Sequence, residues 1–227
     1  MIQSHRMLAI GLAIVGLLSA GVPARAADNT SEELVERARL SLEKMVRSKE
    51  VEPFPSLLKR AKAVLIFPSL LKGAFIFGGE GGTGLLIARD RENKWGHPAF
   101  YTVGSFSFGL QIGGQSSEAV LLIMSERGLK AVMEDQVKLG VDASIAVGPV
   151  GVGVEGSAGT HLNADFYSYS LTAGLFFGGS FEGSVIARRE DLNQQFYGRA
   201  VAPKSIVLDH AVTNPKAEPL RQVLARY

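Results

Sequence analysis

Cysteine is absent from all 227 residues, and histidine and tryptophan are scarce, with four residues and one residue respectively. Without cysteine there are no disulfide bonds, no thiolate metal sites and no cysteine nucleophile. The sequence also lacks the paired histidines of helical zinc hydrolases and the G-x-S-x-G elbow of serine hydrolases. A Ser-His-Asp set assembled from distant positions needs no local motif and stays open as an alternative. These absences predict a protein that is not an enzyme and has no cofactor.

Residues 1–26 have the pattern of a secretory signal peptide. A basic start precedes the apolar run Met7–Leu18, which is too short to span a bilayer comfortably, and Ala24-Arg-Ala26 supplies a small-x-small cleavage pattern. The alternative is an uncleaved membrane anchor. We expect residues 1–26 to be removed, and residues 27–227 to form one secreted domain. Its expected location is periplasmic or extracellular, with peripheral association with a membrane.

The expected mature chain has no excess of either charge. Cleavage removes two of the 24 basic residues, Arg6 and Arg25, and none of the 22 acidic ones, so the two kinds become equal in number. A general nucleic-acid binder is expected to keep a basic excess. The composition therefore predicts no nucleic-acid partner, and any anionic partner must meet a local basic patch.

Glycine is abundant, and two segments fit the G-x-G-x-x-G pattern, Gly79–Gly84 and Gly151–Gly156. A phosphate-binding loop of this type must open a helix, because the helix N-terminus supplies the free N–H groups. Both segments lead into strand-like sequence, and each carries an acid, Glu80 or Glu155. We predict that these glycines allow strands to curve or approach closely, and that no nucleotide binds.

The periodicity predicts an α+β fold, a curled, largely antiparallel glycine-rich sheet (sandwich or barrel-like) with a few packed helices. An amphipathic helix is expected over 29–49, with Leu34, Ala38, Leu42 and Met45 on one face. This helix either packs on the core or lies on a membrane. Further helices are expected over 56–62, 127–139 and the tail from 219. Strands are expected over 63–67, 74–77, 85–88, 99–103, 106–112, 119–124, 143–154, 165–171, 174–178 and 180–188.

A series of short phrases in a fixed order resembles one known family. They are Ala61-Lys-Ala63, Lys72-Gly-Ala-Phe75 with Gly78–Gly84, Arg89 leading to Trp95-Gly-His-Pro-Ala99, Gly109-Leu-Gln-Ile-Gly113, Leu139-Gly-Val-Asp-Ala143 with Gly148-Pro-Val-Gly151, Tyr167-Ser-Tyr169, Gly174-Leu-Phe176, Phe181-Glu-Gly-Ser-Val185 and Asn193-x-x-Phe196-Tyr-Gly198. Together they cover about residues 30–225. On these phrases the chain resembles a secreted bacterial member of the SYLF lipid-binding family, which includes a yeast actin-associated protein.

The resemblance implies a non-catalytic module that binds phospholipid headgroups. Eukaryotic members bind phosphoinositides (phosphatidylinositol binding), and fungal members bind or bundle actin; those relatives also carry SH3 or FYVE domains, which this chain lacks. A secreted protein does not meet cytosolic actin. The expected partner is therefore an anionic phospholipid membrane, with a protein partner as an alternative.

The candidate lipid-binding residues are cations that precede or begin the first strands. They are Lys59, Arg60, Lys62 and Lys72, aided by Arg37, Lys44 and Arg47. Each cation near an anionic surface contributes about 1 kcal/mol, so apolar insertion must add to them. The candidates for insertion are Phe54, Leu57 and Leu58, beside two prolines. The alternative is that the cations form an ordinary solvated face and the apolar residues belong to the core.

Two further interpretations stay open. The curled sheet could enclose an acyl chain as a carrier, with room provided by Gly148, Gly151, Gly153 and Gly156. Glu80, Asp165 and Glu182 could form an acidic pair, although solvated carboxylates are the commoner outcome. No metal site is predicted.

Overall fold

The structure is a computed structural model of the chain, and it describes residues 31–51, 53–74, 78–107, 113–148, 164–172, 175–177 and 181–227. Side chains are described for these residues except 72–74, 78–80, 106–107, 113–115 and 175–177. The predicted signal peptide and the Gly151–Gly156 motif lie outside this part of the chain. Among the residues placed, no helix is long and apolar enough to cross a membrane.

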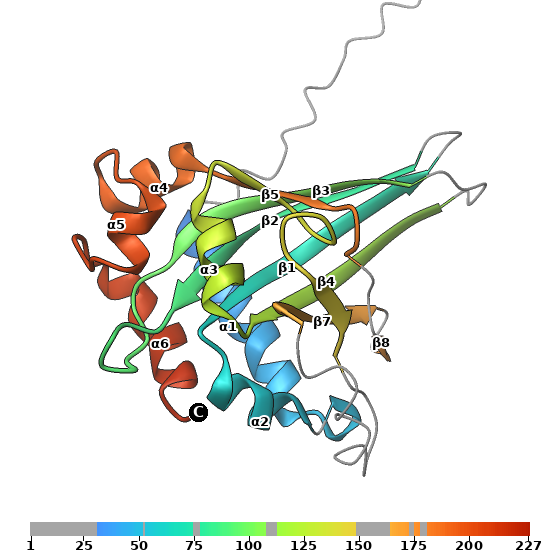
Figure 1. Ribbon diagram of the computed structural model, residues 1–227, viewed down its shortest axis with the longest axis horizontal. Coiled ribbons are helices and arrows are strands. Elements are labelled where there is room, and N and C mark those ends of the chain that lie inside the picture. The colour runs from blue at the N-terminus through green and yellow to red at the C-terminus, as the bar shows by residue number, and fades with distance from the viewer. Residues whose placement is uncertain are drawn as a thin grey trace, which may run out of the picture.

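One sheet of nine strands organises the fold (Figure 1). The strands are β1 (Ala63–Ala74), β2 (Gly78–Ala88), β3 (Ala99–Ser107), β4 (Gly113–Ile123), β5 (Gln136–Lys138), β6 (Ile145–Val147), β7 (Phe166–Thr172), β8 (Leu175–Phe177) and β9 (Val185–Arg188). Their order is β5-β9-β3-β2-β1-β4-β7-β6, with β8 also paired to β7. All pairs are antiparallel except β6 with β7. The α+β prediction of a curled, largely antiparallel sheet is confirmed, in the form of a half-barrel.

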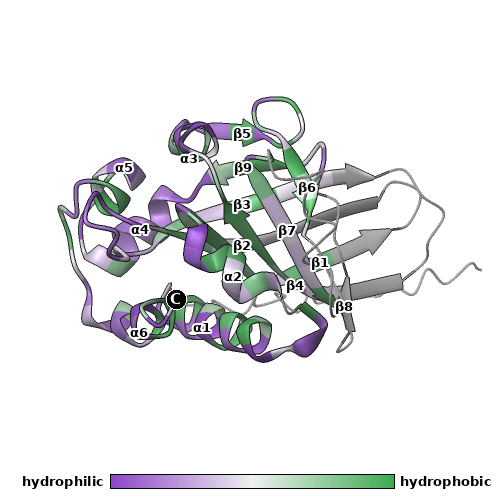
Figure 2. Ribbon diagram, turned by 60° about the horizontal axis from the view of Figure 1, so that its bottom comes forward, coloured by the Kyte–Doolittle hydropathy of each residue, from purple (hydrophilic) through white to green (hydrophobic). Residues whose placement is uncertain are grey.

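Helices cover both faces of this sheet (Figure 2). They are α1 (Ser31–Arg47), α2 (Pro53–Arg60), α3 (Glu126–Met133), α4 (Glu190–Tyr197), α5 (Pro203–Val207) and α6 (Glu218–Leu224), with short 3-10 turns η1 (Lys49–Val51) and η3 (Pro215–Ala217). The elements α1, α2, α4 and α6 supply one apolar cluster, and α3, α5, β5 and β9 supply the other. Because the predicted face of α1 is buried, this helix packs on the core and does not lie on a membrane.

The central strands are buried on both faces at their helix-covered end. In β1, Val64 and Ile66 enter the cluster under α1, whereas Leu65 and Phe67 enter the cluster under α3. Since successive side chains point to opposite faces, a strand buried on both sides reads as a continuous apolar run. This explains the runs over 63–67 and 119–124.

The first G-x-G-x-x-G segment lies inside β2 and has a packing role. β1 bulges where its register shifts between Ile66 and Leu71, around Pro68. A Cβ at Gly84 would stand 2.2 Å from the carbonyl oxygen of Ile66, and one at Gly82 would stand 2.2 Å from that of Ser69. These short distances confirm the predicted close approach of two strands, β1 and β2, for this segment. The bulge in β1 accommodates the proline and brings the β1 backbone close to β2.

Several predicted boundaries are wrong. The first strand continues through Pro68 to Ala74. Proline has no N–H group to donate to a neighbouring strand, and the bulge at this position leaves Pro68 out of the regular pairing. The helix expected over 127–139 ends at Met133, and Gln136–Lys138 pairs with β9 as a strand. Val137 fits the apolar face of a helix and also that of a strand, so the spacing of apolar residues alone predicted the wrong element for it. The helices α4 and α5 were not predicted.

Candidate functional site

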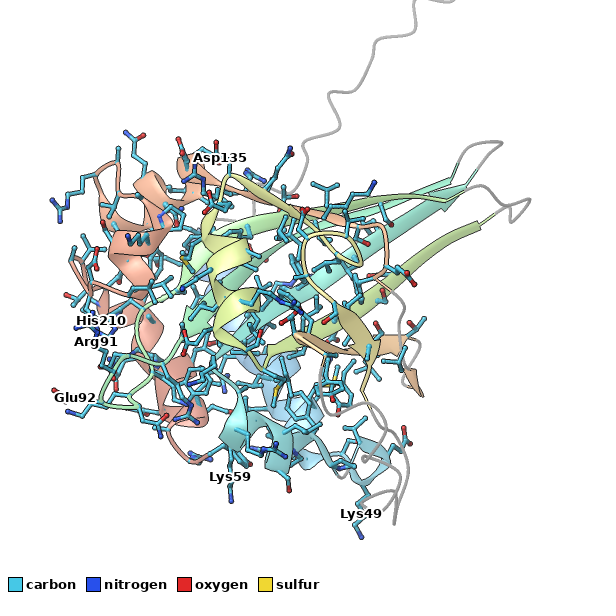
Figure 3. All side chains as sticks on the ribbon, in the orientation of Figure 1. Lys49, Lys59, Arg91, Glu92, Asp135 and His210 are labelled. Atoms are coloured by element: carbon cyan, nitrogen blue, oxygen red, sulfur yellow. The ribbon has the colours of Figure 1, made fainter. Side chains whose placement is uncertain are left out.

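The predicted cations of the second helix lie at its exposed C-terminal end. Lys59 and Arg60 are exposed, and Lys59 projects outward from the end of α2 (Figure 3). Neither has a carboxylate partner among the residues whose side chains are placed. Lys62 is also exposed, but its ammonium group lies 3.1 Å from the Glu126 carboxylate. The side chain of Lys72 lies outside the described residues.

The predicted cations of the first helix interact with neighbouring groups. The Lys44 ammonium lies 2.5 Å from Glu118 of β4, and the Arg47 guanidinium lies 3.5 Å from Glu43 one turn earlier. Arg37 also has an interaction partner. Exposed ion pairs of this kind contribute little to stability. They also reduce the positive charge available to a ligand, which makes α1 a weaker candidate than the end of α2.

The three residues proposed for membrane insertion are buried, which corrects that prediction. Phe54 and Leu58 are 0% exposed and Leu57 is 8% exposed, all within the cluster under α1. The Phe54 ring packs edge-on against Tyr169, with ring centroids 5.0 Å apart. The short helix α2 turns its apolar side to the sheet, so these side chains stabilise the fold and do not reach a membrane.

Sequence reasoning missed a surface pocket between the β2–β3 connection and α6. It has a volume of about 300 Å³, and most of its lining residues have polar or charged side chains, although their apolar atoms form most of the lining surface. The lining residues are Arg89, Asn93, Lys94, Trp95, Glu218, Arg221, Gln222 and Ala225. The lining contributes three cations and one carboxylate, and a second carboxylate, that of Glu92, lies 2.7 Å from the Lys94 ammonium group. The sequence signal was present, since Arg89 and Trp95 belong to one phrase of the family resemblance.

Arg89 is held in the pocket wall without a carboxylate partner among the side chains that the structure describes. Its guanidinium carbon lies 4.2 Å from the Trp95 ring centroid, a cation–π contact. Its Nε donates to the Ala61 carbonyl at 3.2 Å, and its Nη1 donates to the Asn93 carbonyl at 3.0 Å. Burial lowers the pKa of Arg89, because it removes water from around the charged guanidinium. The contact with Ala61 places Arg89 directly beside the end of α2.

Arg221 links α6 to the β2–β3 connection through hydrogen bonds. Its Nε and Nη2 both donate to the Trp95 carbonyl, at 3.1 and 3.0 Å, and its Nη1 donates to Glu218 at 2.7 Å. The third cation, Lys94, is exposed and lies 2.7 Å from Glu92. We call the surface formed by Lys59, Arg60, Lys62, Arg89, Lys94 and Arg221 the basic edge.

His97 lies buried behind the basic edge. Burial, with smaller contributions from Arg221 and His210, lowers the pKa of His97 to about 4. Its Nδ1 has no hydrogen-bond partner among the described residues. In the unfolded chain the His97 imidazole becomes protonated near pH 6.5, whereas in the folded chain it becomes protonated only near pH 4.

Stability is therefore expected to fall as the pH is lowered from about 6.5 to about 4, by roughly 1 to 3 kcal/mol. The variant His97→Gln is expected to lose this part of the pH dependence. Urea denaturation of both proteins across this range checks it. Equal slopes in the two proteins would contradict the role given to His97.

Of the three acids considered as a pair, Asp165 and Glu182 have different surroundings. Asp165 is buried and interacts with Ser125, Arg127 and Ser144, while Glu182 is exposed in a turn. The side chain of Glu80 lies outside the described residues. Within the part of the chain that was placed, no three His, Asp or Glu side chains gather as metal ligands do.

Comparison with known proteins gives one family match and several relatives. The family model described as "Ysc84: Las17-binding protein actin regulator" matches residues 104–227. The chain is 34% identical over 173 residues to SH3 domain-containing protein PJ696.02 of Schizosaccharomyces pombe, covering 75% of this chain and 40% of that protein. It is 33% identical to Protein YSC84 of Saccharomyces cerevisiae, covering 75% of this chain and 37% of that protein.

A human relative extends the comparison. SH3 domain-containing YSC84-like protein 1 of Homo sapiens is 29% identical over 154 residues, covering 67% of this chain and 45% of that protein. The chain thus spans less than half the length of each of these relatives. Two of these three names describe SH3-containing proteins, and none describes an enzyme.

Proposed function

The chain belongs to the Ysc84/SYLF family, and from that premise we propose that it is a non-catalytic module that binds anionic phospholipid at a membrane surface. The proposal includes the predicted location outside the cytoplasm and the predicted signal peptide. Binding takes place through the basic edge and involves no insertion by α2.

One observation carries this proposal, the concentration of cations without acidic partners at the end of α2. Lys59, Arg60 and Arg89 have no carboxylate partner among the side chains that the structure places. They belong to adjacent segments, because the Arg89 backbone N–H donates to the Lys62 carbonyl at 2.8 Å. A local patch of this kind binds anionic headgroups even when the net charge is near zero.

The buried positions of Phe54, Leu57 and Leu58 change the expected mode of binding. The exposed large apolar side chains that the structure describes are Leu40, Leu71, Val141, Val147 and Leu208, on five separate segments. Isolated residues of this kind are common on soluble proteins. Binding is therefore expected to depend mainly on charge and to weaken strongly with salt.

A charge reversal of Lys59→Glu with Arg60→Glu tests the proposal. Each cation near an anionic surface contributes about 1 kcal/mol, so reversing two is expected to weaken vesicle binding by at least about tenfold. Thermal unfolding should stay nearly unchanged, because both side chains are exposed. The measurement is co-sedimentation with anionic vesicles. Lys62 is left in place because a glutamate there would face Glu126.

The matched control is Lys130→Glu with Lys204→Glu. These lysines are exposed on α3 and α5, and their reversal changes the net charge by the same amount. An equal loss of binding in the control pair would show that only total charge matters. Unchanged binding in the Lys59 and Arg60 variant would remove the basic edge from the proposal.

Binding to a protein partner of the actin-regulatory kind is the second candidate. The observation in its favour is the family description and the name of a relative, LAS seventeen-binding protein 3 of Saccharomyces cerevisiae. This chain corresponds to 38% of that relative. Co-sedimentation with actin filaments in the absence of lipid separates this candidate from the first one.

A further inference from the structure

The outer face of α1 carries charges arranged symmetrically about one apolar residue. This helix lies at the border of the molecule (Figure 2), with its apolar face on the sheet. Five of its exposed residues are spaced by three and four positions, so they lie along one side of the helix. We call this row the α1 stripe, and it consists of Glu33, Glu36, Leu40, Lys44 and Arg47.

The α1 stripe is complementary to itself. Glu36 and Glu33 lie four and seven positions before Leu40, and Lys44 and Arg47 lie four and seven positions after it. In a two-fold symmetric contact the same surface is used by both copies. When two α1 helices pack antiparallel with Leu40 at the axis, the acidic half of each stripe lies against the basic half of the other. The two leucines then meet at the centre.

The outermost charges of α1 are those of the stripe. The side chains of Glu36, Lys44 and Arg47 are 53%, 54% and 73% exposed. Arg39 and Glu43 carry the opposite charge to the stripe residues beside them, but their side chains are only 21% exposed. A surface that approaches α1 from outside therefore meets one acidic half and one basic half.

Contacts within the chain leave the stripe able to bind a second partner. Glu36 lies 2.6 Å from Arg39 and Lys44 lies 2.5 Å from Glu118, and Glu33 also has an interaction partner. An ionised carboxylate has about four acceptor positions, and an ammonium group has three donors. Each group can thus join an ion pair across a contact while keeping its present one.

We propose that the α1 stripe is the contact between two copies of this chain, packed antiparallel about a two-fold axis at Leu40. An anionic membrane fits this face less well, because the acidic half of the stripe would be repelled. One helix from each copy makes a small contact, and exposed ion pairs add little energy, so the dimer is weak and reversible. It forms at high protein concentration and dissociates on dilution or at high salt.

A cross-linking experiment tests the position of the axis. The chain contains no cysteine, so Leu40→Cys introduces a single thiol. At a two-fold axis the two introduced thiols face each other across the contact, as disulfide formation requires. Under mild oxidation we expect covalent dimers to form at least about tenfold faster than in Leu208→Cys, because the contact raises the local concentration of thiol. Leu208 is the matched control, a leucine 38% exposed at the end of α5, whereas Leu40 is 44% exposed.

A charge exchange tests the pairing of the two halves. Glu33→Lys with Glu36→Lys makes the stripe wholly basic, and Lys44→Glu with Arg47→Glu makes it wholly acidic. Each double variant is expected to weaken self-association by at least about tenfold, since symmetry turns every reversal into two repulsive contacts. An equal mixture of the two double variants is expected to associate again, and so is the variant that carries all four substitutions. The measurement is sedimentation velocity over a range of protein concentrations, and thermal unfolding checks that each variant is folded.

Every result supports or overturns the dimer. Association restored in the mixture, with faster cross-linking at position 40 than at position 208, would support it. A monomer at every concentration, with equal cross-linking in both cysteine variants, would overturn it. Association that neither double variant weakens would also overturn it, because the contact would then lie on another surface. No vesicle is present in these experiments, so their failure leaves the membrane proposal intact.

Discussion

Replacing Gly84 with alanine is expected to destabilise the protein by about 3 kcal/mol or more, the upper part of the range for overpacked cores. A Cβ at this position would stand 2.2 Å from the Ile66 carbonyl oxygen and 2.5 Å from the Phe67 ring. Both neighbours belong to β1, at the centre of the sheet, and the closest atom is backbone. The two strands must therefore separate, which disturbs the apolar clusters on both faces.

Gly104→Ala is the matched control. Gly104 lies in the adjacent strand β3, and apart from its two neighbours in the chain no described atom lies within 4 Å of the position that its Cβ would take. We expect its stability to stay within about 0.5 kcal/mol of the original protein. Urea denaturation measures both variants. An unfolding midpoint for Gly84→Ala equal to that of Gly104→Ala would contradict the close packing of β2 on the β1 bulge.

Replacing Asp165 with alanine is expected to cost about 2 to 4 kcal/mol, because several donors lose their acceptor together. Its carboxylate accepts from the Ser144 N–H and hydroxyl at 2.8 Å, from Arg127 Nη2 at 2.5 Å and from the Ser125 hydroxyl. Ser125 also caps α3 by accepting from the Gly128 N–H at 2.9 Å. One buried carboxylate thus joins the start of α3, the segment before β6 and the start of β7.

The pH dependence gives this prediction a second measurement. Burial by itself raises the pKa of Asp165, but hydrogen bonds from Arg127, Ser125 and Ser144 outweigh it and hold this pKa well below its usual range. The folded pKa is lowered, so the stabilisation is complete above about pH 4 and is lost as the pH falls further. The difference between the original protein and Asp165→Ala should therefore shrink below about pH 4.

The control for Asp165 is Asp209→Ala, which removes an exposed carboxylate that makes no hydrogen bond or ion pair within the described part of the chain. We expect its stability to stay within about 0.5 kcal/mol of the original protein. A comparable loss in both variants would show that net charge, and not the hydrogen bonds of Asp165, sets the effect.

The fold class and the first helix could be predicted from the sequence because local periodicity decides them. The apolar face of α1 follows the helical repeat, and Leu34, Ala38, Leu42 and Met45 are all buried as that repeat predicts. The passage of β1 through Pro68 could not be predicted. It depends on a bulge whose register is fixed by two neighbouring strands, and on glycines of β2 that are distant from Pro68 in the chain.

The candidate site was predicted only in part. The exposed positions of Lys59, Arg60 and Lys62 agree with a charged run at a helix end. The apolar residues of the same helix, Phe54, Leu57 and Leu58, are buried in the core. A short apolar face can cover a core or enter a membrane, and only its tertiary partners decide between them. The pocket joins Trp95 to Arg221 across 126 positions of the chain, a contact that no local pattern indicates.

Co-sedimentation of the protein with neutral and with anionic vesicles, at low and at high salt, tests the central claim most directly. The basic edge predicts binding to anionic vesicles alone, strongly reduced at high salt because exposed charges are then screened. The absence of binding to anionic vesicles at low salt would contradict the claim. So would equal binding to neutral vesicles that salt does not change.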